Sequence, residues 1–344
     1  MATAHTHRSP DRNCSILVVV VAALAGLALV TSPQTSRDAS SPTPPARGDR
    51  LARLPVRVVR FPYASHDGKP SYALLLLPGW YGPKRHPAIP LVICPHGRNT
   101  TPEAAARRWF DLPTRGGFAV VLPAGQGRRL GLLSWGYPGQ IADLARMPAL
   151  VERAAREVSF RYLRGRVYAV GTSMGGQEAL LLLARRPDLL AGVVAFDPAT
   201  DLADRYVKFA EIPSGREEQR RARIEVGGVP GDVPRSYRVR SPIAYASRLA
   251  VANVPVQLWW STRDEVIVNQ AEQAGRLYRA IKLVDPSAPV VEFVGTWRHA
   301  AVSWAYAKLP SALARIGLLP RTWLARNPLQ TPQVRRAASA PVVA

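Results

Sequence analysis

The stretch GRVYAVGTSMGGQEALLLLARRP, residues 165–187, joins an apolar run rich in β-branched residues directly to a helical pattern. The first part is typical of a buried strand, and the last part places apolar side chains on one helix face, namely Leu180, Leu181, Leu183 and Ala184. The motif Gly171-Thr172-Ser173-Met174-Gly175 lies at the junction. A serine on so sharp a turn needs glycines beside it, because side chains there would collide with the neighbouring strand and helix. The stretch therefore predicts a strand, a sharp turn and a helix, with Ser173 as a candidate nucleophile.

Short apolar runs alternate with helical periodicity from about residue 54 to residue 310. This alternation predicts an α/β fold with a mostly parallel sheet and helices on both of its faces. The first two strands, 56–63 and 72–77, are separated only by the turn-forming SHDGKP, so we expect an antiparallel N-terminal hairpin. Six further strands bring the predicted sheet to eight, at 90–94, 118–122, 167–170, 192–196, 256–260 and 290–294.

The two ends of the chain differ from this middle part. Residues 1–32 contain two arginines and then the apolar run 16–30, which is shorter than the ~20 residues that span a bilayer. This pattern predicts a signal peptide or an uncleaved N-terminal membrane anchor, and hence a secreted or extracytoplasmic protein. Residues 33–53 are expected to be a Ser/Pro-rich linker, 54–325 the folded domain, and 326–344 a flexible tail.

The segment 198–253 is longer than one crossover helix requires. It contains a helical pattern near 202–210, a charged run at 215–225 and a Gly/Pro-rich passage that ends at Pro234. Two interpretations stay open at this stage. The segment could form a small cap over the site, or it could be a solvated insertion, because charge runs usually face water.

The composition limits the classes of partner. The chain of 344 residues has a formal net charge of +22, mostly from scattered arginines. No specific nucleic-acid binding is expected, since no aromatic-interleaved basic stripe accompanies the charge. Electrostatic contact with an anionic envelope polymer or membrane remains open. The two cysteines, Cys14 and Cys94, are not expected to pair, and no Cys/His cluster predicts a metal. No cofactor is expected either.

Elimination among six histidines selects one candidate base for Ser173. His299 stands in VEFVGTWRHAA, just past the last expected strand and ahead of a helix. Catalytic groups of open α/β sheets gather at the carboxyl ends of strands, so this position favours a general base over a packed or surface histidine. The other five lie before the apolar run, in the hairpin turn or around strand 90–94: His5, His7, His66, His86 and His96.

The base needs an acid that holds its ring in the correct tautomer. Asp264 follows the strand 256–260 in the short loop STRDEV and completes the chain order Ser, Asp, His. Asp197, in VVAFDP after the strand 192–196, is the competing candidate, although it could instead cap the turn at Pro198.

The oxyanion of an acyl-transfer reaction needs backbone donors. The turn after Ser173 directs the Met174 amide and a helix N-terminus at one place. The loop Pro95-His96-Gly97-Arg98 follows the strand 90–94, and the amide of Gly97 or Arg98 is the predicted second donor. His96 is expected to brace this loop or to have no role.

Four aromatic residues lie in or near loops that we expect on the site side of the sheet: Trp80, Tyr81, Trp135 and Trp297. They could line an apolar acyl or aromatic pocket. Ordinary core packing is the alternative for each of them.

The stretch from about 56 to 308 resembles the catalytic domain of the prolyl oligopeptidase family and related single-domain esterases of the α/β-hydrolase superfamily. The matching pieces are PHGR at 95–98, GTSMGG at 171–176, RSPIAYASRL at 240–249, STRDEVI at 261–267 and HA at 299–300. The resemblance implies an α/β-hydrolase fold and a catalytic triad of Ser173, Asp264 and His299. It also implies oxyanion donors at Met174 and in the loop after His96.

Two departures from the family favour an esterase. Peptidases of the family usually carry an aromatic residue directly after the nucleophile, where this chain has Met174. They also carry a propeller domain, which the residues before the first strand are too few to build. We therefore expect an exported serine hydrolase that cleaves carboxylic esters through an acyl-enzyme. A peptidase or amidase acting on small peptides is the alternative. A non-catalytic, basic envelope-binding protein is disfavoured because the triad is intact.

Overall fold

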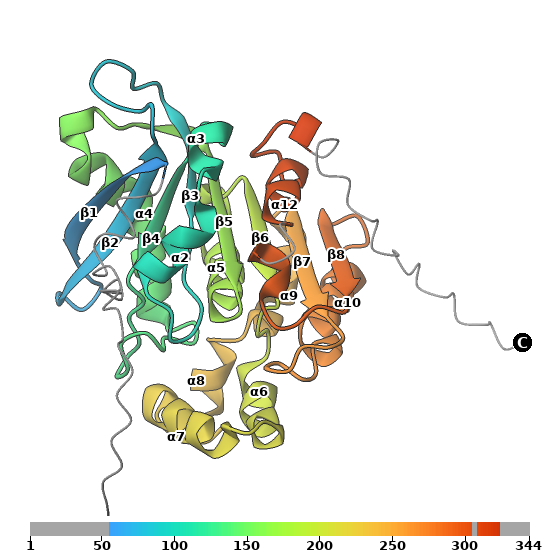
Figure 1. Ribbon diagram of the computed structural model, residues 1–344. Helices are drawn as coiled ribbons and strands as arrows, with labels where there is room; N and C mark the ends of the chain where they lie inside the picture. Colours follow the sequence, from blue (N-terminus) through green and yellow to red (C-terminus); the bar gives the residue numbers. More distant parts are fainter. Residues whose placement is uncertain (1–54, 305–307, 324–344) are drawn as a thin grey trace, which may run out of the picture. The chain divides into compact units, whose positions relative to one another are not determined.

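The computed structural model describes residues 55–304 and 308–323 (Figure 1). The predicted signal or anchor, the linker and the tail therefore lie outside the described residues. Across the described part of the chain, every helix is too short or too polar to span a membrane.

The described residues contain one eight-stranded sheet, as the sequence predicts. The strand order is β1-β2-β4-β3-β5-β6-β7-β8. β2 pairs antiparallel with both β1 and β4, and all other pairs are parallel. The bounds are β1 Val56–Ala64, β2 Pro70–Pro78, β3 Ile89–Ile93, β4 Ala119–Pro123, β5 Tyr162–Thr172, β6 Gly192–Phe196, β7 Val256–Ser261 and β8 Val290–Gly295.

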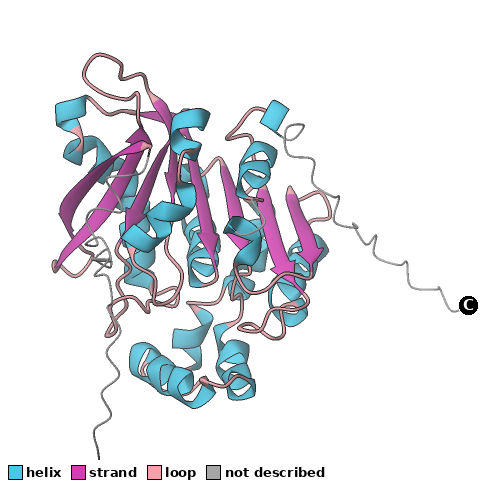
Figure 2. Ribbon diagram, viewed as in Figure 1, coloured by secondary structure: helices cyan, strands magenta, loops and turns pink. Residues whose placement is uncertain are grey.

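Helices cover both faces of this sheet (Figure 2). One face packs against α4 (Pro138–Ala154), α5 (Met174–Arg185), α9 (Ala246–Val251) and α10 (Arg276–Val284). The other face packs against α2 (Pro102–Trp109), α3 (Leu112–Gly116), α11 (Ala301–Trp304) and α12 (Leu309–Arg315). Short turns of 3₁₀-helix occur at Arg156–Val158, Pro187–Leu189, Phe209–Glu211 and Pro242–Tyr245, and one π-helical turn precedes α10 at Ala271–Gly275. The two apolar layers bury the central strands on both faces.

The helix after Ser173, α5, buries the four predicted residues together with the rest of Met174 to Ala184, because the sheet, α4 and α9 surround it. One local prediction needs correction. Strand β5 begins at Tyr162, five residues before the predicted start. Its first residues are largely exposed and include charged side chains, so they do not form an apolar run.

Trp80 and Tyr81 do not lie on the site side of the sheet, contrary to expectation. They follow β2, which runs antiparallel to β4, so the end of β2 lies beside the start of β4. Tyr81 is buried in the core against Phe160, and the Trp80 indole donates to the carbonyl of Thr114. The reversal of one strand therefore moves both aromatic residues to the opposite edge.

The segment 198–253 folds into α6 (Leu202–Lys208), α7 (Gly215–Val226), α8 (Pro234–Arg238) and α9. The first three lie beyond the carboxyl ends of the central strands (Figure 1). They share an apolar cluster with the loops and helix beside Ser173, made of Leu133, Trp135, Met174, Leu202, Phe209, Ala222, Val226 and Tyr237. We call α6–α8 the insert helices. The charged run in α7 is not wholly solvated, because Glu218 and Glu225 are buried.

Candidate active site

Ser173 stands between the end of β5 and the start of α5. Its backbone has φ 59° and ψ −123°, a region that residues other than glycine rarely occupy and that is concentrated at functional sites. The Ser173 amide donates a 2.8 Å hydrogen bond to the Phe196 carbonyl at the end of β6. The sharp turn that the sequence predicts is present, and it places the half-buried serine at the carboxyl edge of the sheet.

The neighbouring glycines are required by close backbone contacts. A Cβ at Gly171 would lie 2.1 Å from the carbonyl oxygen of Gly175. A Cβ at Gly175 would lie 2.2 Å from the carbonyl oxygen of Pro95. The helix that follows Ser173 therefore rests directly on the loop that contains the predicted oxyanion donors.

The structure brings His299 and Asp264 together. Nδ1 of His299 donates to Oδ2 of Asp264 across 2.7 Å, which leaves Nε2 as the ring nitrogen that can accept a proton. Oδ1 of Asp264 accepts the amides of Val266 and Ile267 at 2.9 and 2.7 Å. Burial alone would raise the pKa of Asp264, but the hydrogen bond and charge of His299 together with the amide contact hold it below its ordinary value. The carboxylate is thus ionised and fixed in place.

Glu265 is a site residue that the sequence reasoning missed. One oxygen accepts the amide of His299 at 2.9 Å, and the other accepts Nε of Arg298 at 2.9 Å. The loop of the acid and the loop of the base are therefore joined at two successive residues. The only sequence signal that could have suggested that Glu265 joins the two loops is its position directly after Asp264.

Asp197, the competing acid, binds the backbone and side chain around His299. It accepts the Trp297 indole at 3.1 Å and the Ala300 amide at 2.9 Å. Burial and the charge of Asp264 raise the pKa of Asp197 to about 7, against the opposing effect of His299. Donor atoms of Asp197, Asp264 and His299 lie within 4.8 Å of one another, a spacing that a metal ion could use. Both carboxylates already accept N–H donors, however, and metal binding would have to displace them.

His96 orients the loop of the predicted oxyanion donors. Its Nε2 accepts the Gly125 amide at 2.6 Å, so Nδ1 carries the hydrogen and donates to the Gly97 carbonyl at 2.8 Å. Burial lowers the pKa of His96 and keeps the ring neutral. Because the peptide between Gly97 and Arg98 is trans, its N–H points away from the carbonyl that His96 holds. The amides of Gly97 and Arg98 both remain candidates for the second oxyanion donor.

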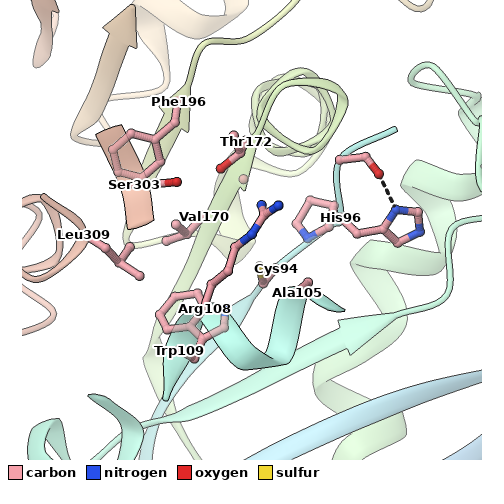
Figure 3. Close-up of a pocket in the computed structure, with 13 residues that line it drawn as sticks. Cys94, His96, Ala105, Arg108, Trp109, Val170, Thr172, Phe196, Ser303 and Leu309 are labelled. Carbon is pink, nitrogen blue, oxygen red and sulfur yellow. Dashed lines mark hydrogen bonds between the residues drawn. The ribbon is translucent and has the colours of Figure 1, made fainter. Parts of the chain in front are cut away.

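A small cavity of about 30 Å³ lies between α2 and the end of β5 (Figure 3). It is lined by Cys94, Thr172 and Arg108, among others, and Figure 3 also shows the hydrogen bond from His96. A cavity of this size accommodates only one or two waters. Burial raises the pKa of the free Cys94 to about 11, so this cysteine stays a thiol and is a poor nucleophile.

Two arginines connect the insert helices to the loops of the site. Arg98 forms an ion pair with the buried Glu218 of α7. Arg205 of α6, itself buried, donates to the carbonyl of Val266 in the loop of Asp264. Nothing in the sequence signalled either contact, since the partners lie far apart in the chain. The insert helices therefore contact the loop of Asp264 and the loop 95–98, which we call the oxyanion loop because it holds the predicted oxyanion donors.

Glu178 lies one helical turn after Met174 and is completely enclosed. Ser134 donates to its carboxyl group and also contacts the Met174 sulfur at 3.7 Å. Burial raises the pKa of Glu178 to about 7, although hydrogen bonds from Ser134 and Gln140 oppose the shift. The protonatable carboxyl group of Glu178 therefore packs against the start of α5 through Ser134 and Met174.

This position predicts a pH dependence of stability. The pKa of Glu178 is higher in the folded state than its ordinary value of 4.5, so the folded state binds the extra proton and stability is lost as the pH rises through about 7. We expect the melting temperature of Glu178→Gln to vary less between pH 5 and 8 than that of the wild type. Scanning calorimetry across this range tests it, and parallel curves for the two proteins would contradict it.

The comparisons with known proteins agree with this architecture. Residues 152–290 match the model of the prolyl oligopeptidase family; they include Ser173 and Asp264, whereas His299 lies beyond them. The chain has the α/β-hydrolase fold. The matched segment and the shared fold agree with the resemblance to serine hydrolases that the sequence implies. A comparison with curated proteins found no match.

Solved structures of both peptidases and esterases share the fold. A puromycin-hydrolysing peptidase of Mycobacterium tuberculosis aligns with a TM-score of 0.59 and 20% identity, over 83% of this chain and 41% of that one. An acylaminoacyl peptidase of Pyrococcus horikoshii gives 0.56 and 15%, over 75% and 40%. An esterase of Pyrobaculum calidifontis gives 0.56 and 16%, over 78% and 87%. The α/β-hydrolase chain thus spans about 40% of the peptidases and most of the esterase.

Proposed function

We propose that this chain is a serine hydrolase that cleaves carboxylic esters through an acyl-enzyme. The observation that carries the proposal is the strained Ser173 turn at the same sheet edge as the His299–Asp264 pair. A serine nucleophile needs an adjacent base whose second ring nitrogen is held by a carboxylate. In our proposal Ser173, His299 and Asp264 fill these three roles.

In the proposed reaction, Nε2 of His299 takes the proton of Ser173 as its oxygen attacks the acyl carbon. The amides of Met174 and of either Gly97 or Arg98 stabilise the negative oxygen of the tetrahedral intermediate, each contributing roughly 2.7–4 kcal/mol. His299 then passes the proton to the departing alcohol. In the second half, His299 takes a proton from water, whose oxygen attacks the acyl-enzyme, and the proton returns to Ser173.

Two observations support esters over amides. The esterase of Pyrobaculum calidifontis is aligned over 87% of its length, and esterases of Rhizomucor miehei are aligned over 85% with a TM-score of 0.59. Met174 follows the nucleophile, and its sulfur accepts the Trp135 amide at 3.3 Å within the apolar cluster of the insert helices. The Met174 side chain is therefore held by packing within this cluster.

Hydrolysis of small peptides or amides is the second candidate, because the matched family is named for a peptidase and two of the aligned structures are peptidases. Export from the cytoplasm is part of our proposal and rests on the apolar run 16–30 alone. Cell fractionation with an antibody to the folded domain tests the location. Recovery only in the cytosol would remove export from the proposal.

Matched substrates separate the two candidates. p-Nitrophenyl butyrate and p-nitrobutyranilide have the same acyl group and differ in the bond that is cleaved. We expect kcat/KM for the ester to exceed that for the anilide and for aminoacyl anilides by at least about 10³-fold, or about 4 kcal/mol in transition-state stabilisation. An aminoacyl anilide cleaved within tenfold of the ester would assign a peptidase instead.

A further inference from the structure

Asp197 is a buried carboxylate at a strained position next to the candidate triad. It follows β6 directly, its φ is 44° and its side chain is fully buried. Asparagine and aspartate tolerate this left-handed backbone better than most residues. The Asp197 amide donates a 2.6 Å hydrogen bond to the Trp259 carbonyl of β7, so the backbone is fixed from the neighbouring strand.

The carboxylate of Asp197 holds the loop of His299 on both sides of that residue. The Trp297 indole, two residues before His299, lies 3.1 Å from each of its oxygens. The Ala300 amide, one residue after His299, lies 2.9 Å from Oδ2. Neither donor is charged, so the contact is a clamp on the loop and not an ion pair.

Asp197 also lies in the chain of contacts between the base and the nucleophile. The residue before it, Phe196, accepts the Ser173 amide at 2.8 Å. Hydrogen bonds of this two-residue segment thus connect the Ser173 turn to the His299 loop. A shift of the segment would change the separation of the two catalytic side chains.

Two carboxylates therefore surround one imidazole. An oxygen of Asp197, an oxygen of Asp264 and a ring nitrogen of His299 all lie within 4.8 Å of one another. The charged groups that act on Asp197 are His299 and Asp264. When His299 is protonated in the reaction, the positive charge is close enough to interact with both acids.

We propose that Asp197 is a positioning residue for His299 and a second acid that stabilises the imidazolium when Asp264 cannot. This inference rests on the proposed function of the Ser173 site. It assigns Asp264 to the tautomer of the ring and Asp197 to the placement of the loop. Because both acids stabilise the protonated His299 ring in this proposal, removal of both should lower kcat more than removal of Asp264 alone.

Four variants test the proposal: Asp197→Ala, Asp197→Asn, Asp264→Asn and the double Asp264→Asn/Asp197→Asn. Alanine removes the acceptor of Trp297 and Ala300, and we expect kcat about 10–100-fold lower with little change in KM, since a misplaced base costs about this much. Asparagine keeps an acceptor and tolerates the backbone, so kcat should recover to within about threefold of wild type. Asp285→Asn, on an exposed turn, is the matched control.

The second-acid role is tested in the background that lacks Asp264. A site with one acid loses about 10⁴-fold in kcat when that acid becomes asparagine. We expect Asp264→Asn alone to lose only about 10²–10³-fold, and the double variant to fall at least another tenfold. The residual activity of Asp264→Asn should also rise with pH as Asp197 ionises, more steeply than that of the double variant.

The rate of Ser173 labelling by a fluorophosphonate is measured alongside ester turnover. Labelling depends on the base and acid but not on the natural substrate. Wild type that is labelled but turns over no ester would count against the ester proposal alone. Equal rates for Asp264→Asn and the double variant would overturn the second-acid role. Wild-type kcat in Asp197→Ala would overturn the positioning role. If Asp197→Ala does not fold, the second-acid role is still decided by the kcat of the double variant relative to that of Asp264→Asn.

Discussion

Ser173→Ala is expected to lower kcat on p-nitrophenyl butyrate by about 10⁶-fold, to the residual rate that binding and the oxyanion site provide. The reason is local. Ser173 supplies the only atom that attacks the acyl carbon in the proposed mechanism, and alanine removes one oxygen without altering the turn. The variant should retain the melting temperature of the wild type to within a few degrees.

A fluorophosphonate probe with mass analysis of the labelled peptide measures the same prediction independently. Wild type should carry one adduct, on Ser173, and Ser173→Ala should carry none. Ser287→Ala is a matched control, because Ser287 is an exposed serine whose hydroxyl contacts Asp285 on a surface turn. Persistent labelling of Ser173→Ala would move the nucleophile elsewhere.

Gly175→Ala is expected to produce the second-largest effect. The new Cβ would lie 2.2 Å from the Pro95 carbonyl oxygen and 3.1 Å from that of His96. Both atoms belong to the backbone of the oxyanion loop, so neither can rotate aside. The loop or the helix must move, and we expect kcat/KM to fall at least about 10³-fold together with a loss of stability of a few kcal/mol.

The adjacent glycine is the matched control for this prediction. A Cβ at Gly176 would meet the Pro198 side chain at 3.2 Å and no backbone atom closer than 3.3 Å. Gly176→Ala should therefore retain kcat/KM within about tenfold, since small displacements suffice. Kinetics and thermal melting of the two variants make the comparison. Similar losses of kcat/KM in the two variants would show that any substitution at the start of α5 is harmful, whether or not it meets Pro95.

The sequence predicted the eight strands and the hairpin because buried strands are short apolar runs and their period is local information. It predicted Ser173 for a related reason. The sharp turn needs glycines at fixed positions, and these steric needs appear directly in residues 171–176. The rule that strand ends share one edge placed both Asp264 and Asp197 near His299, but it did not choose between them.

The same rule failed for Trp80 and Tyr81. Their strand, β2, runs antiparallel to its neighbours, so its end lies at the opposite edge. An apolar run does not record the direction of its strand within the sheet. Direction is decided by which strands pair, and that depends on residues distant in the chain.

The polar contacts that support the site were also hidden from the sequence. Glu225 of α7 is fully buried and accepts the amides of Arg128, Arg129 and Leu130 at 2.6–3.0 Å. In the sequence it belongs to a charged run that would usually face water. A buried carboxylate is tolerated only where several donors converge on it, and here they come from a loop about 95 residues away in the chain.

The amino-acid sequence by itself determined the strand–turn–helix unit around Ser173 and the order of the strands along the chain, since glycine sterics and hydrophobic periods act between near neighbours. Only the tertiary structure decided which carboxylate contacts His299, where Asp197 binds, and how α7 reaches the oxyanion loop. Those outcomes depend on distances between strand ends and on burial, because a carboxylate becomes a partner, a clamp or a surface charge according to the donors that the fold brings to it.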